Sequence, residues 1–471
     1  MTLNELRSKY QAVGQTHVFK FTDGLSADSQ AKLAGQLSAY DPAFIKELSD
    51  DYVKQKPQVH LPKDIKPVQI LPRVADAAHK DQYAKALARG NELLKQGKVA
   101  AFLVAGGQGT RLGYDGPKGE YPVTPVKNKP LFQVFAEQLL AHSKASGKTI
   151  PWYIMTSDTN DAATRAFFAK HSHFGYPAHD VFFFQQGMIP AFDAATGQLL
   201  LGAKDSLALA ADGHGGSLRA IDKSGALADM KKRGVEHLSY FQVDNPIVHT
   251  IDPLFIGLHD LSGSEMSSKT IAKAGPLEKV GNFCIGDGEL QVIEYSDLPE
   301  ELAKRTNADG SLMFNAGSIA IHALRVSFIE RLNKGGKLSL PWHRADKKMP
   351  FVDGAGNLVK PDKPNAVKLE QFVFDAIPLA NNAIVYETAR DEEFSPVKNA
   401  DGNDSPATSR RDQIRRNAKW LKAAGVQVPY TTAGEPDAII EISPLYAVTV
   451  AELVAKKPKL TIKPGEMVYL E

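Results

Sequence analysis

Apolar residues run without interruption through several short stretches in the middle of this chain, and each stretch ends in polar residues. The clearest are WYIMTS (152–157), VFFFQQ (181–186) and HLSYFQVDN (237–245). Continuous apolar runs of this length predict strands that are buried on both faces of a parallel or mixed sheet. Between them, apolar residues at helical spacing predict helices over 131–146 and 162–171. Alternating strands and helices indicate an α/β fold.

A polar residue stands at the end of each of these three strands, namely Ser157, Gln186 and Asp244. The carboxyl ends of parallel strands meet at one edge of a sheet, and open α/β sheets bind their ligands at such an edge. We therefore expect the three side chains to gather along one edge and to form part of a binding site.

The region before residue 98 is predicted to be mainly helical. Asp41 is a suitable helix cap, and Pro42 suits the first helical position of a helix that runs to Tyr52. A second helix is expected from about residue 75 to 96. A chain of 471 residues is too long for one compact core. We predict a helical N-terminal region (1–97), a central α/β domain (98–387) and a small C-terminal domain (388–471).

Shorter elements are expected in the second half of the chain. The segment 267–293 predicts strands joined by turns, and 346–363 is polar and glycine-rich, as in a β-turn excursion. In the C-terminal region we predict a helix over 410–424, followed by the short alternating segments VTV, LTI and VYL.

Composition excludes several classes of function. Lys and Arg number 56 against 54 Asp and Glu, and no basic run stands out, so we do not expect nucleic acid as a partner. The single cysteine, Cys284, cannot form an intrachain disulfide, and we expect it to be a small buried residue. No stretch approaches the ~18–20 apolar residues of a membrane helix, and the N-terminus is polar. We expect a cytoplasmic protein with no membrane partner.

A glycine-rich loop is the strongest indication of chemistry. The apolar run from Ala100 to Ala105 leads directly into Gly106, Gly107 and Gly109, and Arg111 and Lys118 follow in LVAGGQGTRLGYDGPKG (103–119). Glycines after a buried strand leave backbone N–H groups free and let a phosphate approach without a Cβ clash. Arg111 and Lys118 add positive charge on the same loop. The loop predicts a nucleotide triphosphate site.

Two other glycine loops do not fit. The ATPase P-loop ends in Gly-Lys-Ser/Thr, which this chain lacks. The dinucleotide fingerprint begins well at Gly107 and Gly109, but its sixth position is Leu112, and no acidic residue follows at a strand end ~20 residues later. A dinucleotide oxidoreductase is therefore disfavoured.

The loop GGQGTRLG with its following PKG resembles that of the eukaryotic-type UDP-sugar pyrophosphorylases, and most closely the UDP-N-acetylhexosamine (UDP-N-acetylglucosamine) pyrophosphorylases. The resemblance extends from the helical N-terminus to about Pro444. Further landmarks occur in the family's order: FQQGMIPA (184–191), DGHGG (212–216), VDNPIV (243–248), VIEYSDL (292–298), FNAG (314–317), KLEQFVFD (368–375) and EEFSPVKN (392–399).

This resemblance implies a Rossmann-like fold of the nucleotide-diphospho-sugar transferase type, with 98–387 as the catalytic nucleotidyltransferase domain. It also implies an activity: a uridylyltransferase that makes UDP-sugar and pyrophosphate from UTP and a sugar-1-phosphate, with Mg²⁺. The implied sugar is N-acetylglucosamine-1-phosphate. Three alternatives stay open: a UTP–glucose-1-phosphate uridylyltransferase, a broad-range UDP-sugar pyrophosphorylase, and a non-catalytic nucleotide-sugar-binding regulator.

The resemblance also assigns roles around the nucleotide. It makes Arg111, Lys118 and Lys398 the catalytic cations: Arg111 faces the β- and γ-phosphates, Lys118 the α-phosphate and Lys398 the phosphate of the sugar. Asp244 becomes the magnesium ligand, because Mg²⁺ pairs one or two carboxylates with substrate phosphates. The implied nucleotide-binding positions are Ala105, Gly106, Gly107, Gln186, Gly213, Asp244 and Lys368. Gln186 suits uracil because an amide both donates and accepts hydrogen bonds.

The sugar pocket departs from the family's usual sequence. Relatives specific for N-acetylated sugars usually have Gly-Asn-Gly-Gly after the uracil site, and UDP-glucose enzymes tend to have Gly-His-Gly-Asp. This chain has Gly213-His214-Gly215-Gly216, which shares half of each. The implied sugar-binding residues are His214, Glu294, Asn315, Phe372 and Phe374. Glu294 and Asn315 match the N-acetylhexosamine type, whereas His214 favours glucose.

Overall fold

The computed structural model of this chain describes residues 1–57, 61–336, 338 and 340–471. The fold separates into two compact units, each assembled from segments that are distant in sequence. Unit 1 comprises residues 1–60, 186–217 and 339–375; unit 2 comprises 61–185, 218–338 and 376–471. The three-part division expected from the sequence stays a prediction.

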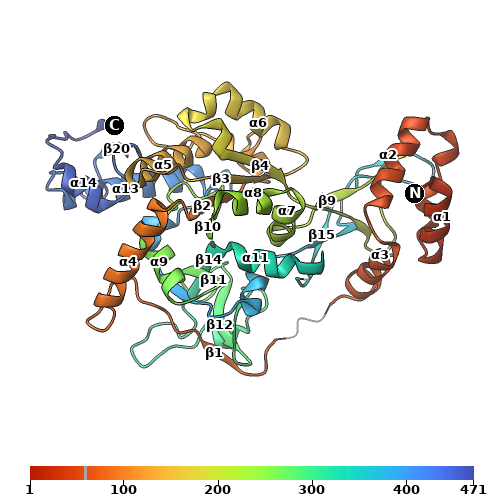
Figure 1. Cartoon of the computed structure of the whole chain (residues 1–471), viewed down its shortest axis with the longest axis horizontal. Helices are drawn as coiled ribbons and strands as arrows, with labels where there is room; N and C mark the ends of the chain where they lie inside the picture. The colour runs from red at the N-terminus through yellow and green to blue at the C-terminus, as the bar shows by residue number, and fades with distance from the viewer. Residues whose placement is uncertain (58–60, 337, 339) are drawn as a thin grey trace. The chain divides into compact units, whose positions relative to one another are not determined.

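A ten-stranded mixed sheet forms the centre of unit 2, with a main strand order of β1-β12-β14-β10-β2-β3-β4 (Figure 1). Strands β10, β2, β3 and β4 are parallel, so their carboxyl ends share one edge, whereas β14 runs antiparallel to β10. The remaining strands, β11, β13 and β19, pair with β14, β12 and β11. The bounds are β1 (Ile65–Pro67), β2 (Val99–Val104), β3 (Trp152–Thr156), β4 (Val181–Gln185), β10 (His237–Gln242), β11 (Met266–Ala272), β12 (Asn282–Gly286), β13 (Glu289–Ile293), β14 (Ala316–Arg325) and β19 (Val385–Glu387).

Helices cover both faces of the parallel strands. Phe135 of α5 (Leu131–Ser146) packs against Phe241, and Phe168 of α6 (Asp161–Lys170) packs against Trp152, on one face. On the other face, the Tyr153 hydroxyl donates to Asp229 of α8 (Ala226–Arg233) at 2.7 Å. Burial on both faces explains why these strands are continuously apolar in sequence.

Helices α4 (Lys80–Lys95) and α9 (Pro253–Leu261) lie side by side in backbone contact (Figure 1). A Cβ at Gly90 would lie 1.8 Å from the Pro253 carbonyl oxygen, and one at Gly257 would lie 1.7 Å from that of Ala86. Because no side chain fits between them, glycine is required at both positions. The other helices of unit 2 are α7 (Ser217–Lys223, which starts at the boundary with unit 1), α10 (Glu300–Ala303), α11 (Val326–Asn333), α12 (Arg390–Glu393), α13 (Pro406–Ala423) and α14 (Val450–Lys456).

Unit 1 combines the N-terminal helices with small sheets. Its helices are α1 (Leu3–Ala12), α2 (Ala27–Ser38) and α3 (Pro42–Leu48), and they pack on a core that includes Phe192, Val367 and Leu369. Its sheets pair β15-β18-β6, β5-β9, β7-β8 and β16-β17. These strands are β5 (Met188–Pro190), β6 (Phe192–Asp193), β7 (Leu201–Ala203), β8 (Ser206–Leu207), β9 (Leu209–Ala211), β15 (His343–Lys347), β16 (Phe351–Val352), β17 (Leu358–Val359) and β18 (Ala366–Glu370).

Most elements predicted from the sequence are confirmed, and a few are wrong. Helix α4 begins at Lys80 and not at residue 75, because the Asp76 carboxylate accepts from the backbone N–H groups of Ala78 and His79 and holds a turn there. VTV forms no strand, since Thr449 caps α14, and LTI lies outside any strand. Phe372 lies outside the regular elements, and Phe374 belongs to a short 3₁₀ helix, Val373–Leu379.

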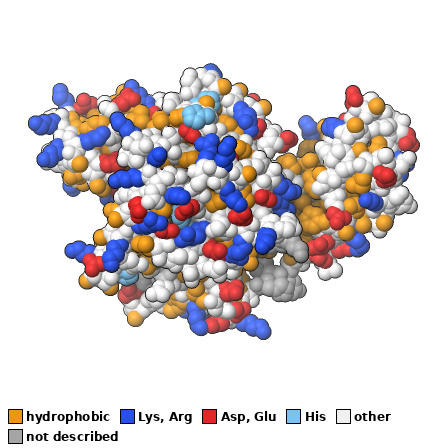
Figure 2. All heavy atoms as spheres, in the orientation of Figure 1, with side chains coloured by type: hydrophobic (Ala, Val, Ile, Leu, Met, Phe, Trp, Pro, Cys, Tyr) orange, Lys and Arg blue, Asp and Glu red, His pale blue; other side chains and the backbone are white. Residues whose placement is uncertain are grey.

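Side chains of opposite charge are interspersed on the face shown in Figure 2, in keeping with the formal net charge of +2. Among the described residues, no helix has both the length and the apolar character that crossing a membrane requires.

Candidate active site

The glycine loop after β2 is closed by its own backbone. Gly109 N–H donates to the Gly116 carbonyl at 2.8 Å, and Lys118 N–H donates to the Gly107 carbonyl at 3.1 Å. A Cβ at Gly119 would lie 2.1 Å from Phe132, so this glycine is needed for packing. At Gly107 a Cβ would meet no atom within 4 Å. The protein therefore leaves open space at Gly107, as a loop that admits a phosphate must.

The start of the loop is held by Asn160, next to α6. Its side-chain amide donates to the Ala105 carbonyl at 2.9 Å and to the Gly107 carbonyl at 3.3 Å. Ala105 is buried and its N–H donates to Met155 of β3, while Gly106 is half-buried. These bonds to neighbouring elements fix the loop at the edge where the parallel strands end.

Four charged side chains converge on this edge. Burial lowers the pKa of Lys118; the nearby cations Arg111 and Lys398 lower it further, while the Asp244 carboxylate acts in the opposite direction. Lys118 therefore lies near two other cations and one carboxylate, and this excess of positive charge attracts anions. Asp244 follows β10, the strand next to β2, which explains how two distant motifs meet.

A pocket beside this cluster is lined by Asp244, Lys398 and residues from the neighbouring strands. Asp244 is the one carboxylate in its lining, and Lys279 adds a second lysine. Ala320 of β14 also lines it, with φ of 53°, a left-handed conformation that is costly for a residue with a Cβ. Lys279, Asn245, Ser318 and Ala320 were not predicted as site residues. Only Asn245 lies in one of the sequence landmarks, so it alone could have been found there.

Glu294 lies close to this pocket, and Asn315 immediately precedes β14, which contributes residues to the pocket's lining. A Cβ at Gly281, a lining residue, would be 3.1 Å from Glu294 Oε1. The Asn315 side-chain oxygen accepts from the Lys273 backbone N–H at 2.8 Å, which fixes its amide. Both residues belong to unit 2, together with Arg111, Lys118, Asp244 and Lys398.

The remaining predicted residues lie in unit 1. There the glycine loop 213–216 packs against the backbone of Gln371. Gly213 has φ of 85°, and a Cβ there would lie 2.4 Å from the Gln371 carbonyl oxygen. Gly215 N–H donates to the same carbonyl at 2.8 Å. Gln186, at the start of the 186–217 segment, is half-buried. The Gln371 backbone thus fixes the position of the loop 213–216 and leaves no room for a side chain at Gly213.

His214 stacks on Phe372, with ring centroids 5.2 Å apart and planes at 19°, and Phe374 lies 6.0 Å away. The Val373 backbone N–H donates to His214 Nδ1 at 3.1 Å. Burial lowers the pKa of His214 to about 4, so the ring is neutral and its proton resides on Nε2. His343 stacks on Phe372 at 4.2 Å and its Nε2 lies 2.8 Å from Asp375.

Lys368 lies on β18 and forms an ion pair with Glu370, two residues along the same strand. Alternate residues of a strand share a face, which explains the pairing. The partner of Lys368 in the structure is therefore an acidic residue of the same strand, within unit 1.

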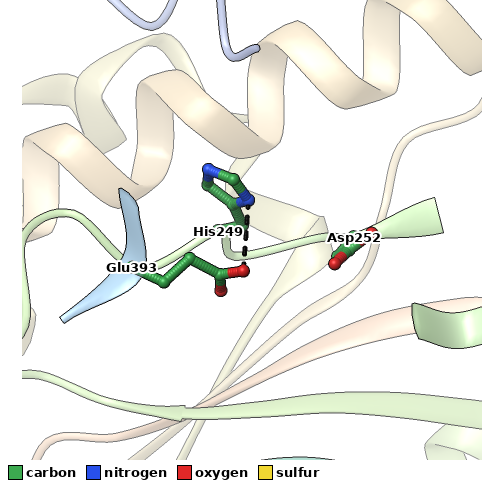
Figure 3. A group of neighbouring side chains, drawn as sticks. All are labelled: His249, Asp252 and Glu393. Carbon is green, nitrogen blue, oxygen red and sulfur yellow. Dashed lines mark ion pairs between the residues drawn. The ribbon is translucent and has the colours of Figure 1, made fainter. Parts of the chain in front are cut away.

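The described residues contain one cluster with the composition of a metal site, His249, Asp252 and Glu393 (Figure 3). Lys269 Nζ lies 2.7 Å from Asp252 Oδ2 and 2.5 Å from Glu393 Oε1. Burial disfavours the charge of Lys269, but the two carboxylates raise its pKa above the ordinary value. An ammonium group therefore already neutralises this cluster, and a metal ion does not fit there. Of the four charged residues at the glycine-loop edge, Asp244 alone has the donor chemistry that a divalent ion needs.

Comparison with known proteins decides the family. The family model described as UTP–glucose-1-phosphate uridylyltransferase matches residues 44–410. The chain belongs to this family. It is therefore a uridylyltransferase; the family's substrates are UTP and a sugar-1-phosphate, its by-product is pyrophosphate, and its members generally use a divalent metal.

Relatives and solved structures cover nearly the whole chain. The human UDP-N-acetylhexosamine pyrophosphorylase-like protein 1 is 37% identical over 94% of this chain and 92% of its own length. The UDP-N-acetylglucosamine pyrophosphorylase of Saccharomyces cerevisiae is 35% identical over 90% and 92%. The crystal structure of the uridine diphosphate N-acetylglucosamine pyrophosphorylase of Trypanosoma brucei superposes with a TM-score of 0.79 over 98% of this chain and 97% of that one, at 24% identity. These matches confirm the Rossmann-like α/β fold.

Proposed function

We propose that this enzyme transfers the uridylyl group of UTP to N-acetylglucosamine-1-phosphate. The observation that carries the proposal is the proximity of Arg111, Lys398 and Asp244 to Lys118, beside a glycine loop with open space. The names of the human and yeast relatives support an N-acetylated sugar. Glucose-1-phosphate is the competing substrate, because His214 stands where UDP-glucose enzymes also tend to have histidine.

In the proposed reaction, a phosphate oxygen of the sugar-1-phosphate attacks the α-phosphorus of UTP. A new P–O bond forms, the bond between the α-phosphorus and its bridging oxygen breaks, and pyrophosphate leaves with that electron pair. No covalent enzyme intermediate is needed, since positioning and charge neutralisation suffice for such transfers. Lys118 neutralises the α-phosphate, Arg111 the departing pyrophosphate, and Lys398 holds the attacking phosphate.

We infer that Mg²⁺ is the metal and that Asp244 holds it together with substrate phosphates and water. Bound there, the ion would neutralise phosphate charge. Ala105, Gly106 and Gly107 would face the phosphates, Gln186 and Gly213 the uracil ring, and Lys368 the nucleotide phosphates. His214, Glu294, Asn315, Phe372 and Phe374 would surround the sugar. A cytoplasmic location is part of the same proposal.

The test is pyrophosphate release from UTP and Mg²⁺ with four sugar-1-phosphates: N-acetylglucosamine, N-acetylgalactosamine, glucose and galactose. A site built to hydrogen-bond the acetamide can reject the hydroxyl analogue by ~10⁴-fold, whereas a merely roomy pocket discriminates by only ~10–200-fold. Preference for glucose would overturn the sugar assignment. Lys118→Ala should lower turnover by about 10²-fold or more, with the exposed Lys148→Ala as matched control.

A further inference from the structure

The segment that carries Lys398 is attached directly to the loop that carries Asp244. Val397 N–H donates to the Asp244 carbonyl at 2.7 Å. One residue further along that loop, Asn245 Nδ2 donates to the Glu393 carbonyl at 2.6 Å, and Asn245 Oδ1 accepts from the Ser395 N–H at 3.2 Å. Two segments that are distant in sequence are thus joined by three hydrogen bonds.

The Asn245 side-chain amide makes the two hydrogen bonds that a backbone peptide group of a neighbouring strand would make. Its amide donates to residue 393 and accepts from residue 395, which is how a neighbouring strand pairs with alternate residues. The side chain is buried, with a relative exposure of 5% for the residue, and both of its polar atoms are used. An amide carries its donor and its acceptor on two separate atoms, so it can pair with a carbonyl and an N–H of another segment at the same time.

A buried ion pair anchors the same segment at its start. Glu393 Oε1 accepts from Lys269 at 2.5 Å and from the Thr388 hydroxyl at 2.8 Å (Figure 3 shows Glu393 beside His249 and Asp252). At its other end, Lys398 N–H donates to the Asp404 carbonyl at 2.6 Å. The segment 393–398 is held at its start, middle and end, so the position of Lys398 is set by these bonds.

We propose that Asn245 is a positioning residue of the active site, which holds Lys398 at a fixed place beside Asp244. This inference rests on the proposed roles of Lys398 and Asp244. Asn245 does not need to touch substrate, because its amide is occupied by the backbone of the Lys398 segment. Its contribution reaches the reaction through Lys398, whose proposed ligand is the phosphate of the sugar and not the phosphates of UTP.

Asn245→Ala removes both amide bonds and leaves the Val397–Asp244 bond in place. A misplacement of ~1 Å costs an oriented reaction about 10²-fold, so kcat/KM for N-acetylglucosamine-1-phosphate should fall by about 10- to 100-fold. The KM for UTP should change by less than about threefold. Asn333→Ala is the matched control, because Asn333 is also buried and donates to the backbone carbonyls of Leu218 and Ile329. It should leave both constants unchanged.

A double-mutant cycle with Lys398→Ala isolates the coupling. If Asn245 acts through Lys398, adding Asn245→Ala to Lys398→Ala should change kcat/KM for the sugar phosphate by less than about twofold. Additive losses, or equal effects on both substrates, would overturn the inference. If Asn245→Ala is unimpaired while Lys398→Ala is impaired, the inference is also overturned, but the proposed function stays intact. A normal Lys398→Ala enzyme would overturn the proposed role of Lys398 and this inference together.

If Asn245→Ala does not accumulate as folded protein, Asn245→Ser is measured in the same cycle. Failure of both variants to fold, while Asn333→Ala folds, would assign Asn245 a structural role and overturn the inference.

Discussion

Replacement of Lys269 by methionine tests how the buried carboxylates Asp252 and Glu393 are stabilised. The Lys269 side chain is 1% exposed, and its partners Glu393 and Asp252 are 3% and 18% exposed. Removing one partner of a buried ion pair costs about 3–5 kcal/mol, because the other charge stays buried without compensation. Here two carboxylates lose the same ammonium group, so the upper part of that range is expected. This is a large share of the ~5–15 kcal/mol that stabilises a typical native protein.

Equilibrium urea unfolding followed by tryptophan fluorescence measures the change, because Trp152 and Trp420 are both buried in the same unit as Lys269. The matched control is Lys231→Met: Lys231 pairs with Glu330, both side chains are 51% exposed, and such surface pairs contribute only about 0–1 kcal/mol.

The pH dependence of the difference in stability between Lys269→Met and the wild type is an independent test. In Lys269→Met the buried Asp252 carboxylate loses the cation that lowers its pKa, and burial then raises its folded-state pKa. The variant therefore gains stability relative to the wild type as the pH falls and Asp252 takes up a proton. A loss below about 1 kcal/mol at neutral pH, or a deficit that does not narrow on acidification, would refute the assignment of Lys269 as the neutralising cation.

Three further predictions concern the site and its surroundings. Burial and two neighbouring cations lower the pKa of Lys118, so kcat/KM for UTP should begin to fall with rising pH below the ordinary lysine value of 10.5. Lys118→Arg should move that fall to higher pH, and an unchanged pH profile of kcat/KM in alkaline solution would contradict the role of Lys118. Gly213→Ala should raise the KM for UTP at least about tenfold without unfolding the chain, because the new Cβ would lie 2.4 Å from the Gln371 carbonyl oxygen at a φ of 85°. A normal KM for UTP would show that Gly213 is not part of the nucleotide site. Cys284 is buried and burial raises its pKa to about 11, so a thiol reagent at neutral pH should label it only after denaturation; rapid labelling of the native enzyme would contradict its burial.

Local patterns were sufficient for the elements that form the α/β core. The helix predicted over 131–146 matches α5 at both ends, where Pro130 precedes the first turn and Gly147, with φ of 72°, ends the last. The predicted strand ends were displaced by only one to three residues, because strands buried on both faces are apolar along their whole length. The start of α4 was misplaced because a single aspartate side chain holds a turn there, which periodicity does not reveal.

The charged cluster was predictable in outline because its parts follow adjacent parallel strands. The glycine loop follows β2 and Asp244 follows β10, so strand order alone brings Lys118 and Asp244 to one edge. The arrangement that supports the cluster was not predictable. Lys269 meets Glu393, and Asn245 meets the backbone at 393 and 395, through tertiary contacts between segments more than a hundred residues apart. No local spacing or periodicity encodes such a contact.

His214 illustrates how a fixed tautomer constrains the proposed sugar site. The Val373 N–H occupies Nδ1, so the neutral ring has Nε2–H as its remaining polar group, and this group can only donate. The asparagine usual in relatives specific for N-acetylated sugars offers both a donor and an acceptor. An acetamide has both an N–H donor and a carbonyl acceptor, so an asparagine amide can pair with both groups, whereas the His214 ring can pair with the carbonyl oxygen alone. His214→Asn should therefore improve use of N-acetylglucosamine-1-phosphate relative to glucose-1-phosphate. A shift of the kcat/KM ratio in the opposite direction would contradict this argument.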